Sequence, residues 1–209
     1  MALELGAGLT MYLVRHGETA ANVEHRFQGR NDTPLTEKGR MQARMIAAIL
    51  AERVKGRSLP HFVASPLPRT RTYMELILDA LKLPKAYATD PRLMEIDLGA
   101  WSGLTEAEAC ALDPKVFDER LRDKWNVRVP GGGENYAMVA ERIASWVASV
   151  REDTVAVTHG AFTRILRGLV QGLNAQQMSA LDEPQDCVFE FQGRTLTRLE
   201  YEGPKLSPV

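Results

Sequence analysis

The chain alternates short apolar runs with longer amphipathic stretches, which is the pattern of a parallel α/β sheet. Three runs have the length and composition of buried strands, and they cover residues 11–14, 61–65 and 154–158. Between and after these runs, apolar residues recur at helical spacing, so we expect helices over residues 36–53, 68–81, 135–150 and 160–170. The repeated order of strand and helix predicts one sheet with helices packed on it.

Local signals support several of these boundaries. Thr36, followed by a glutamate, makes a plausible helix start, and Asn135 is a good N-cap. Residues 187–191 and 195–201 read as two strands separated by Gln-Gly-Arg, which predicts a β-hairpin at the end of the chain. We therefore expect two further strands after the last long helix.

Two stretches lack this periodicity. Residues 17–34 read as a polar loop. Residues 92–134 contain Trp101, Trp125, two short helical stretches and three consecutive glycines near the end. That composition suits an insertion over an active site, or simply a long connection. We find no internal repeats or linkers, and we expect one domain over residues 1–209.

The composition narrows the class of protein. The 209 residues carry a net charge of −1, with 44% hydrophobic and 25% charged residues. This balance argues against a nucleic-acid or membrane binder, so an anionic substrate must be held by a few well-placed arginines. Cys110 and Cys187 lie far apart and predict no disulfide framework or zinc site. No stretch is apolar enough to span a bilayer, and Met1–Gly8 lacks the features of a secretory signal, so we expect a cytoplasmic protein.

Chemically active residues follow the first predicted strand. Arg15 and His16 come directly after it, and Gly17 lets the backbone turn close to a ligand. A guanidinium binds an anion bidentately, and an imidazole without its proton can attack phosphorus. The pair therefore suits a phosphoryl group, although an Arg-His pair can also simply end a strand.

The other two predicted inner strands end in similar groups. Ser65-Pro66-Leu67-Pro68 leads to Arg69, and His159 with Gly160 follows the third strand. Arg69 could be a solvated charge and His159 a buried core histidine. Their shared position favours a site, because ligands bind at the carboxyl ends of parallel strands. Gly160 also opens a helix, whose backbone amides favour a phosphate oxygen.

Six segments in order resemble the histidine phosphatase superfamily, in its phosphoglycerate-mutase-like branch, and together they cover most of the chain. The first three read Leu-Val-Arg-His-Gly-Glu-Thr-Ala-Ala-Asn (13–22), Arg-Phe-Gln-Gly-Arg-Asn-Asp-Thr-Pro-Leu-Thr-Glu-Lys-Gly (26–39) and Ala-Ser-Pro-Leu-Pro-Arg-Thr (64–70). The others read Met-Glu-Ile-Asp-Leu-Gly-Ala-Trp-Ser-Gly-Leu-Thr (94–105), Pro-Gly-Gly-Gly-Glu (130–134) and Val-Thr-His-Gly (157–160). The resemblance implies a three-layer α/β/α sandwich with a mostly parallel central sheet and a small helical insertion, about residues 92–134, over the active site.

The resemblance also implies roles for individual residues. His16 would be the nucleophile that becomes phosphohistidine, and Glu95 the general acid for the leaving oxygen. The residues implied to bind the phosphate or substrate are Arg15, His16, Asn22, Gln28, Gly29, Arg69, His159 and the amide of Gly160. Such donors stabilise a phosphoryl group without a metal, so we expect neither metal nor cofactor. Glu95 could instead be a surface carboxylate, and Phe27 and Trp101 could shape the pocket or belong to the core.

Both phosphatases and mutases of this family form phosphohistidine, so the shared motifs do not separate them. Cofactor-dependent mutases carry a Tyr and a Lys where this chain has Leu98 and Glu106, and their insertion holds adjacent arginines. Here Arg120, Arg122 and Arg128 are never adjacent. A glutamate in place of the lysine would repel a glyceric acid phosphate.

These departures favour a phosphomonoesterase acting on small phosphorylated metabolites. The alternatives are a cofactor-dependent phosphoglycerate mutase and, more remotely, a non-catalytic phospho-ligand binder. The expected partner is a small phosphorylated metabolite rather than nucleic acid or a membrane. The oligomeric state is left open, with a homodimer as one option.

Overall fold

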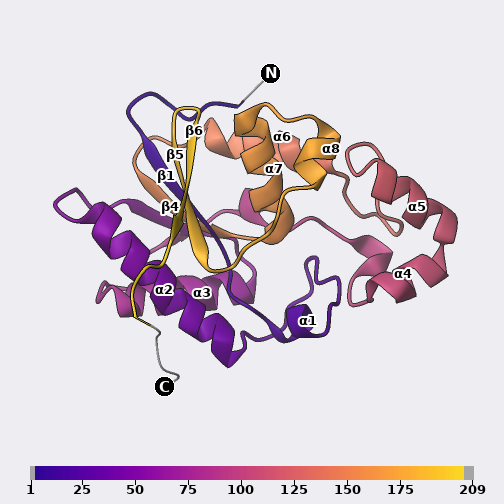
Figure 1. Ribbon diagram of the computed structural model, residues 1–209, viewed down its shortest axis with the longest axis horizontal. Helices are drawn as coiled ribbons and strands as arrows, with labels where there is room; N and C mark the ends of the chain where they lie inside the picture. Colours follow the sequence, from indigo (N-terminus) through magenta and orange to yellow (C-terminus); the bar gives the residue numbers. More distant parts are fainter. Residues whose placement is uncertain (1–2, 205–209) are drawn as a thin grey trace.

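A six-stranded mixed sheet forms the centre of the molecule (Figure 1). The structure is a computed structural model that describes residues 3–204. The strands are β1 (Thr10–Arg15), β2 (His61–Ala64), β3 (Ala88–Thr89), β4 (Thr154–Thr158), β5 (Cys187–Gln192) and β6 (Thr195–Glu200). They lie in the order β3-β2-β4-β1-β5-β6; the first four are parallel, whereas β5 runs antiparallel to both β1 and β6. The predicted parallel strands and the terminal hairpin are confirmed.

Four long helices cover the two faces of this sheet and complete the predicted three-layer sandwich (Figure 1). Helices α2 (Glu37–Val54) and α3 (Pro68–Ala80) pack with Tyr12 and Val14 of β1. Helices α6 (Tyr136–Val147) and α7 (Gly160–Gln171) pack on the other face with Met11 and Leu13. Alternate residues of β1 thus enter opposite cores, so the whole strand is buried, as expected for an inner strand of a covered sheet.

The register of the inner strands aligns their carboxyl ends. Arg15 of β1 lies opposite Thr158 of β4, and the next amide, that of His16, donates to the Thr158 carbonyl across 2.9 Å. On the other side of β4, the Ser65 amide donates to Val157 across 3.0 Å. The residues that follow β1, β2 and β4 therefore meet at one edge of the sheet.

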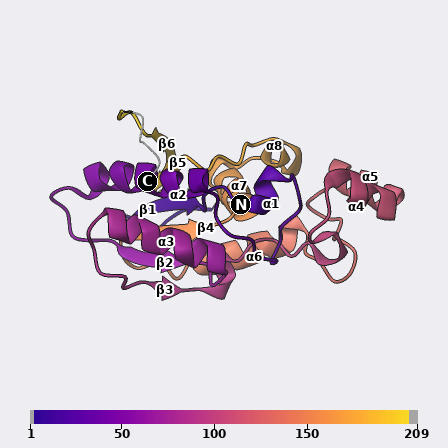
Figure 2. The same ribbon diagram turned by 90° about the horizontal axis from the view of Figure 1, so that it is seen from below.

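The segment predicted as an insertion extends from one end of the sandwich (Figures 1 and 2). It contains two 3₁₀ helices, η1 (Pro91–Leu93) and η2 (Gly99–Trp101), and then α4 (Glu106–Leu112) and α5 (Pro114–Arg122). A small core of its own holds it together, made of Trp101, Ala109, Phe117 and Val129. Both expected short helical stretches are present.

Five short elements were not predicted from the sequence. They are β3, the 3₁₀ helices η1 and η2, and the helices α1 (Ala20–Val23) and α8 (Ala175–Ser179). Helix α1 lies within the expected polar loop, where Thr19 and Asn22 form a reciprocal capping box. Elements of two to five residues are too short to show a hydrophobic period, so capping was the one available signal. Within residues 3–204, no helix combines the length and apolar character needed to cross a bilayer.

Candidate active site

A cavity of about 620 Å³ opens beside the carboxyl end of β1. The predicted site residues that line it are Arg15, His16, Asn22, Gln28, Gly29, Arg69 and Glu95. His159 is fully buried and does not line the cavity; its ring packs edge-on against His16, with the two ring centroids 5.2 Å apart. The fold therefore brings the three predicted strand-end clusters together, with His159 in a supporting position.

Both ring nitrogens of His16 have a hydrogen-bond partner. Nδ1 lies 2.8 Å from the carbonyl oxygen of Gly17, and Nε2 lies 3.2 Å from Nε of Arg69, which is a donor. Nδ1 must carry the proton to bond a carbonyl, so Nε2 presents its lone pair. Burial, and then the charges of Arg69 and Arg15, hold the pKa of His16 well below its ordinary value. The imidazole is thus neutral at pH 7, and its Nε2 lone pair accepts the hydrogen bond from Arg69 Nε.

Arg69 is held by backbone carbonyls from the first loop. Its Nη2 donates to Gly29 across 2.7 Å, and its Nη1 donates to Asn31 across 2.8 Å. The Asp32 carboxylate lies 3.2 Å from Nη1 and also accepts the Arg69 backbone amide at the start of α3. The arginine is 2% exposed as a residue and has little freedom. Gly29 thus acts on this arginine through its carbonyl, besides lining the cavity.

His159 is fixed by the end of β2. Its Nε2 lies 2.8 Å from Oγ of Ser65, whereas Nδ1 is buried with no partner among the described residues. Burial, followed by the charge of Arg69 and the ring of His16, places the pKa of His159 well below its ordinary value. A buried nitrogen without a partner is costly unless a ligand or water completes it.

A carboxylate that the sequence did not single out occupies the region above the start of α7. Arg15 donates from Nη1 to the Glu183 backbone carbonyl, and its Nε is buried without a partner in the described structure. The Glu183 Oε2 lies 4.0 Å from Arg15 Nη1. A Cβ placed on Gly160 would lie only 2.5 Å from that oxygen. The chain's own anion therefore lies where the sequence predicts phosphate contacts.

Glu95 lies close to the carboxylate of Glu183. Its Oε1 accepts the Ile96 amide across 2.9 Å, and its Oε2 accepts the Ala161 amide of α7 across 3.3 Å. Desolvation by the surrounding protein, and next the negative charge of Glu183, raise the pKa of Glu95. The protonated form needed in a general acid is therefore favoured, which argues against the alternative of a solvated surface carboxylate.

The Pro-Gly-Gly-Gly-Glu motif ends in a residue that anchors the Glu95 loop. Glu134 accepts the Asp97 amide across 2.8 Å and pairs with Arg142 at 3.3 Å. Arg142 in turn donates to the carbonyl of Met94 across 2.6 Å. Glu134, just before α6, and Arg142, within α6, thus hold the backbone on both sides of Glu95.

Asn22 and Gln28 form part of a hydrogen-bonded floor beside His16. Oδ1 of Asn22 accepts the Thr19 amide across 3.1 Å and the Gln185 side chain across 2.9 Å. Gln28 contacts the Thr19 hydroxyl at 3.2 Å and donates to Thr33 across 2.8 Å. Both side chains are positioned before a ligand arrives.

Other cavity residues were missed by sequence reasoning. They are Lys124, Tyr136, Arg164, Glu183 and Gln185, and Arg120 was considered only as a non-adjacent arginine. Arg164 pairs with Glu183 at 3.3 Å and donates to the Tyr136 hydroxyl across 3.1 Å. It follows Gly160 by four residues on α7, so helical spacing could have identified it. Lys124 and Glu183 lie outside any motif and carry no comparable signal in the sequence.

Phe27 and Trp101, which the sequence placed either at the pocket or in the core, take both roles. Phe27 and Trp101 stack with ring centroids 6.2 Å apart, and both line the cavity. Trp101 also belongs to the buried core of the insertion. These rings therefore form a wall of the pocket because they are packed into the structure behind it.

The remaining cysteines and histidines form no second site. Burial raises the pKa of the free thiol Cys187 to about 12, which makes it unreactive. His25 lines the cavity, whereas His61 lies 3.9 Å from Glu152 on the surface. In the described part of the chain, no group of three or more His, Cys, Asp or Glu side chains could hold a metal ion.

This fold and site agree with the family comparison: the chain belongs to the histidine phosphatase superfamily, branch 1, whose profile matches residues 11–201. A relative from Photorhabdus laumondii, named probable phosphoglycerate mutase GpmB, is 32% identical over 207 residues, covering 93% of this chain and 86% of the relative. A GpmB from Proteus mirabilis is 35% identical and covers 80% of this chain and 77% of the relative.

Solved structures give the same result. YhfR of Bacillus stearothermophilus has a TM-score of 0.75 and 30% identity, with 95% of this chain and 98% of that chain covered. A mycobacterial glucosyl-3-phosphoglycerate phosphatase has a TM-score of 0.75 and 29% identity, with 93% of this chain and 100% of that chain covered. Members of the superfamily are phosphatases or mutases, so the comparisons support an enzymatic activity for this chain.

Proposed function

We propose that the protein is a phosphatase that hydrolyses small phosphomonoesters through a phosphohistidine on His16, without a metal ion. The observation that carries this proposal is the orientation of His16, whose Nδ1 faces the Gly17 carbonyl and whose Nε2 faces Arg69. The imidazole is neutral, and its Nε2 lone pair becomes the nucleophile once the incoming phosphoryl group displaces the hydrogen bond from Arg69 Nε.

In the first step, Nε2 of His16 attacks phosphorus and the bond to the ester oxygen breaks. Glu95 gives its proton to that oxygen, and the alcohol leaves. The Gly17 carbonyl stabilises the proton that remains on Nδ1. Arg15 and Arg69 supply positive charge, and the Gly160 amide a hydrogen-bond donor, around the equatorial oxygens, while the buried His159 ring packs against His16 and supports it.

In the second step, water attacks the phosphohistidine while Glu95 takes its proton. The bond between phosphorus and Nε2 breaks, phosphate leaves, and His16 and Glu95 return to their starting states. The same carboxyl group serves both steps, which its raised pKa supports.

Two cavity residues support hydrolysis over transfer. Leu98 and Glu106 line the cavity at the positions where mutases of the family carry a Tyr and a Lys. The glucosyl-3-phosphoglycerate phosphatase among the similar structures is a precedent for hydrolysis on this fold. The names of the GpmB relatives favour the second candidate, a cofactor-dependent phosphoglycerate mutase.

The deciding experiment measures phosphate release from a panel of metabolite monoesters and p-nitrophenyl phosphate, with EDTA present. Interconversion of 3- and 2-phosphoglycerate is followed in parallel, with 2,3-bisphosphoglycerate as primer. We expect phosphate release and negligible interconversion. Efficient primer-dependent interconversion with little phosphate release would establish the mutase instead.

A second arm of this experiment addresses the intermediate. Rapid quenching with labelled substrate should trap an acid-labile, base-stable phosphoprotein in the wild-type enzyme and none in His16→Ala. Full turnover by His16→Ala would exclude His16 as the nucleophile.

A further inference from the structure

We propose that Gln185 is a positioning residue of the active site. Its side chain holds the Asn22 amide in the orientation that offers hydrogen-bond donors to a phosphoryl group, and it also holds the backbone of His16. The inference rests on the proposed function, and it assigns a role to a residue that lies outside the sequence motifs of the site.

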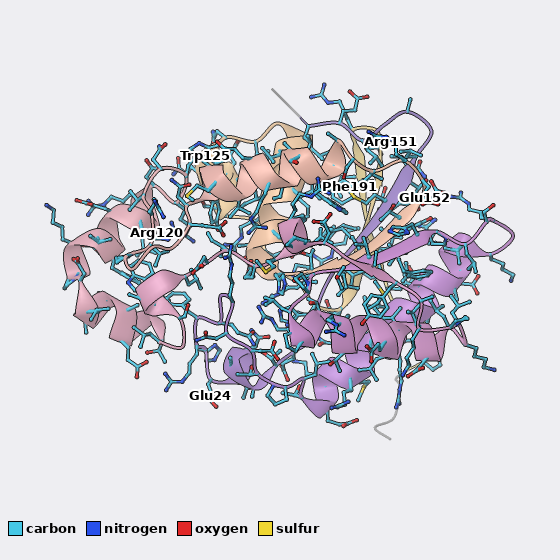
Figure 3. All side chains as sticks on the ribbon, turned by 180° about the vertical axis from the view of Figure 1, so that it is seen from behind. Glu24, Arg120, Trp125, Arg151, Glu152 and Phe191 are labelled. Atoms are coloured by element: carbon cyan, nitrogen blue, oxygen red, sulfur yellow. The ribbon has the colours of Figure 1, made fainter. Side chains whose placement is uncertain are left out.

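Gln185 joins segments that are far apart in the chain. It lies in the loop before β5, whereas His16 follows β1 and Asn22 lies on α1, 169 and 163 positions away. Figure 3 labels a residue near each end of this connection, Phe191 of β5 and Glu24 just after α1. Gln185, His16 and Asn22 all line the cavity, so the loop before β5 contributes to its wall.

The partners of Gln185 decide which way its own amide faces. Its Nε2 lies 3.2 Å from the carbonyl oxygen of His16, and a backbone carbonyl only accepts hydrogen bonds. The atom in that position must therefore be the amide nitrogen. The same nitrogen lies 2.9 Å from the Asn22 side chain and has a second hydrogen to donate there.

This orientation in turn decides that of Asn22. The atom of Asn22 that faces Gln185 must be an acceptor, and it also accepts the backbone amide of Thr19 across 3.1 Å. Two donors from different segments thus identify this atom as Oδ1. Nδ2 of Asn22 donates to no other residue within 3–204, so its two hydrogens are left for a ligand in the cavity.

The orientation of the Asn22 amide matters to an anion. A phosphoryl oxygen accepts hydrogen bonds, so Nδ2 stabilises it, whereas Oδ1 in the same place would repel it. Without Gln185, the donors left on Oδ1 would both come from Thr19, which belongs to the same turn of the chain. Gln185 is therefore the partner that ties this amide to another part of the fold.

Gln185 also completes the support of the nucleophile's backbone. The amide of His16 donates to Thr158 of β4 across 2.9 Å, and its carbonyl accepts from Gln185. The next carbonyl, that of Gly17, accepts the proton on Nδ1 of the imidazole across 2.8 Å. One side chain thus acts on the nucleophile and on a phosphate donor together.

The segment that carries Gln185 is itself fixed. Arg167 of α7 is buried and donates to the Asp182 side chain across 2.8 Å and to the Asp182 carbonyl. Arg15 donates to the carbonyl of Glu183. The Gln185 amide therefore projects from a rigid support, as precise positioning requires.

A double-mutant cycle tests whether Gln185 acts through Asn22. Gln185→Met keeps an unbranched side chain of the same length and removes its donors. Calorimetry gives the affinity for inorganic phosphate in the wild type, Gln185→Met, Asn22→Ala and the double variant. We expect Gln185→Met to weaken phosphate binding about tenfold in the wild type, and to have little further effect once Asn22 is alanine.

A residue that only held the loop would give a different result. It would weaken phosphate binding by the same factor with and without Asn22, and this additive outcome would overturn the proposal. Unchanged phosphate affinity in Gln185→Met would overturn it as well. The control is Gln192→Met, at an exposed position of β5, which should bind phosphate like the wild type.

NMR of the wild type gives a second measurement that does not depend on how the Gln185 variant folds. The side-chain amide signals of Asn22, identified by their loss in Asn22→Ala, should shift when phosphate is added. Signals that stay in place would show that Nδ2 does not meet phosphate, which contradicts the proposal.

None of these measurements needs turnover. If the wild type binds phosphate but hydrolyses none of the monoesters, the phosphatase proposal fails while the cycle still decides the role of Gln185. If phosphate release is normal and the cycle is additive, the role of Gln185 is refuted and the phosphatase stands. A wild type that does not bind phosphate would overturn both.

Discussion

The carboxylate of Glu183 covers Gly160, so closely that a Cβ on this glycine would lie 2.5 Å from Oε2. Gly160 begins α7, and the amides at the start of a helix favour an anion. The free protein therefore holds its own negative charge beside the predicted phosphate contacts. A bound phosphate would have to compete with this charge or displace it.

We expect Glu183→Gln to bind inorganic phosphate more tightly, because the amide keeps the size of the side chain and removes the repulsion. The gain should be about tenfold, or ~1.4 kcal/mol, measured as the competitive inhibition constant. The exposed Glu141 on α6 provides the control variant, Glu141→Gln. An unchanged inhibition constant in Glu183→Gln would show that Glu183 does not compete with phosphate.

The same variant should alter the pH profile of kcat/KM. Glu183 raises the pKa of Glu95, so its removal lets Glu95 lose its proton at a lower pH. Because the acid must be protonated for the first step, the alkaline limb of the profile should move to lower pH. If the alkaline limb does not move, a group other than Glu95 is responsible for it.

Arg69→Lys should lower kcat/KM nearly as much as Arg69→Ala, by roughly 100-fold, or about 3 kcal/mol. A lysine ammonium cannot reach His16, Gly29 and the Asn31 carbonyl together, whereas the planar guanidinium does so. Arg71→Lys, on the exposed side of the same helix, is the matched control. Near-normal activity of Arg69→Lys would mean that charge alone is sufficient.

Glu95→Gln should affect substrates according to their leaving groups. An alkoxide needs a proton to depart, whereas p-nitrophenolate does not, so the variant should lose roughly 100-fold or more with an alkyl phosphate. The pre-steady-state burst of p-nitrophenol reports phosphorylation alone and should change far less. Equal losses for both substrates would argue against Glu95 as the general acid.

Acid should destabilise the protein because two buried histidines resist protonation. The pKa values of His16 and His159 lie well below 6.5 in the folded state, whereas the unfolded chain takes up these protons near pH 6.5. Stability from these groups is thus present above pH 6.5 and lost as the pH falls, by up to about 1.4 kcal/mol per pH unit for each histidine.

Urea unfolding between pH 7.5 and 5 measures this loss. His159→Asn should reduce the slope of the unfolding free energy against pH, whatever its effect at pH 7. The variant His61→Asn, at an exposed position, is measured in parallel as the control. An identical slope in His159→Asn would show that His159 takes up its proton without cost.

The sequence by itself determined the five longer strands of the sheet, the helices that cover it and the strand-end residues of the site. Fully buried strands read as apolar runs, and parallel strands end at one edge of a sheet. The positions of Arg15, His16 and Arg69 just after such runs are therefore enough to bring them to one site. The family resemblance added Glu95, which has no periodic signal of its own.

The tertiary structure decided the tautomer, the hydrogen-bond partners and the charged neighbours of these groups. The tautomer of His16 follows from two partners on different segments, and Arg15 contacts Glu183 across 168 positions of the chain. The proximity of Lys124 to Arg164 likewise depends on how the insertion packs against α7. Hydrophobic periodicity records which residues are buried within one element, but it holds no information on which polar side chains from distant loops will meet.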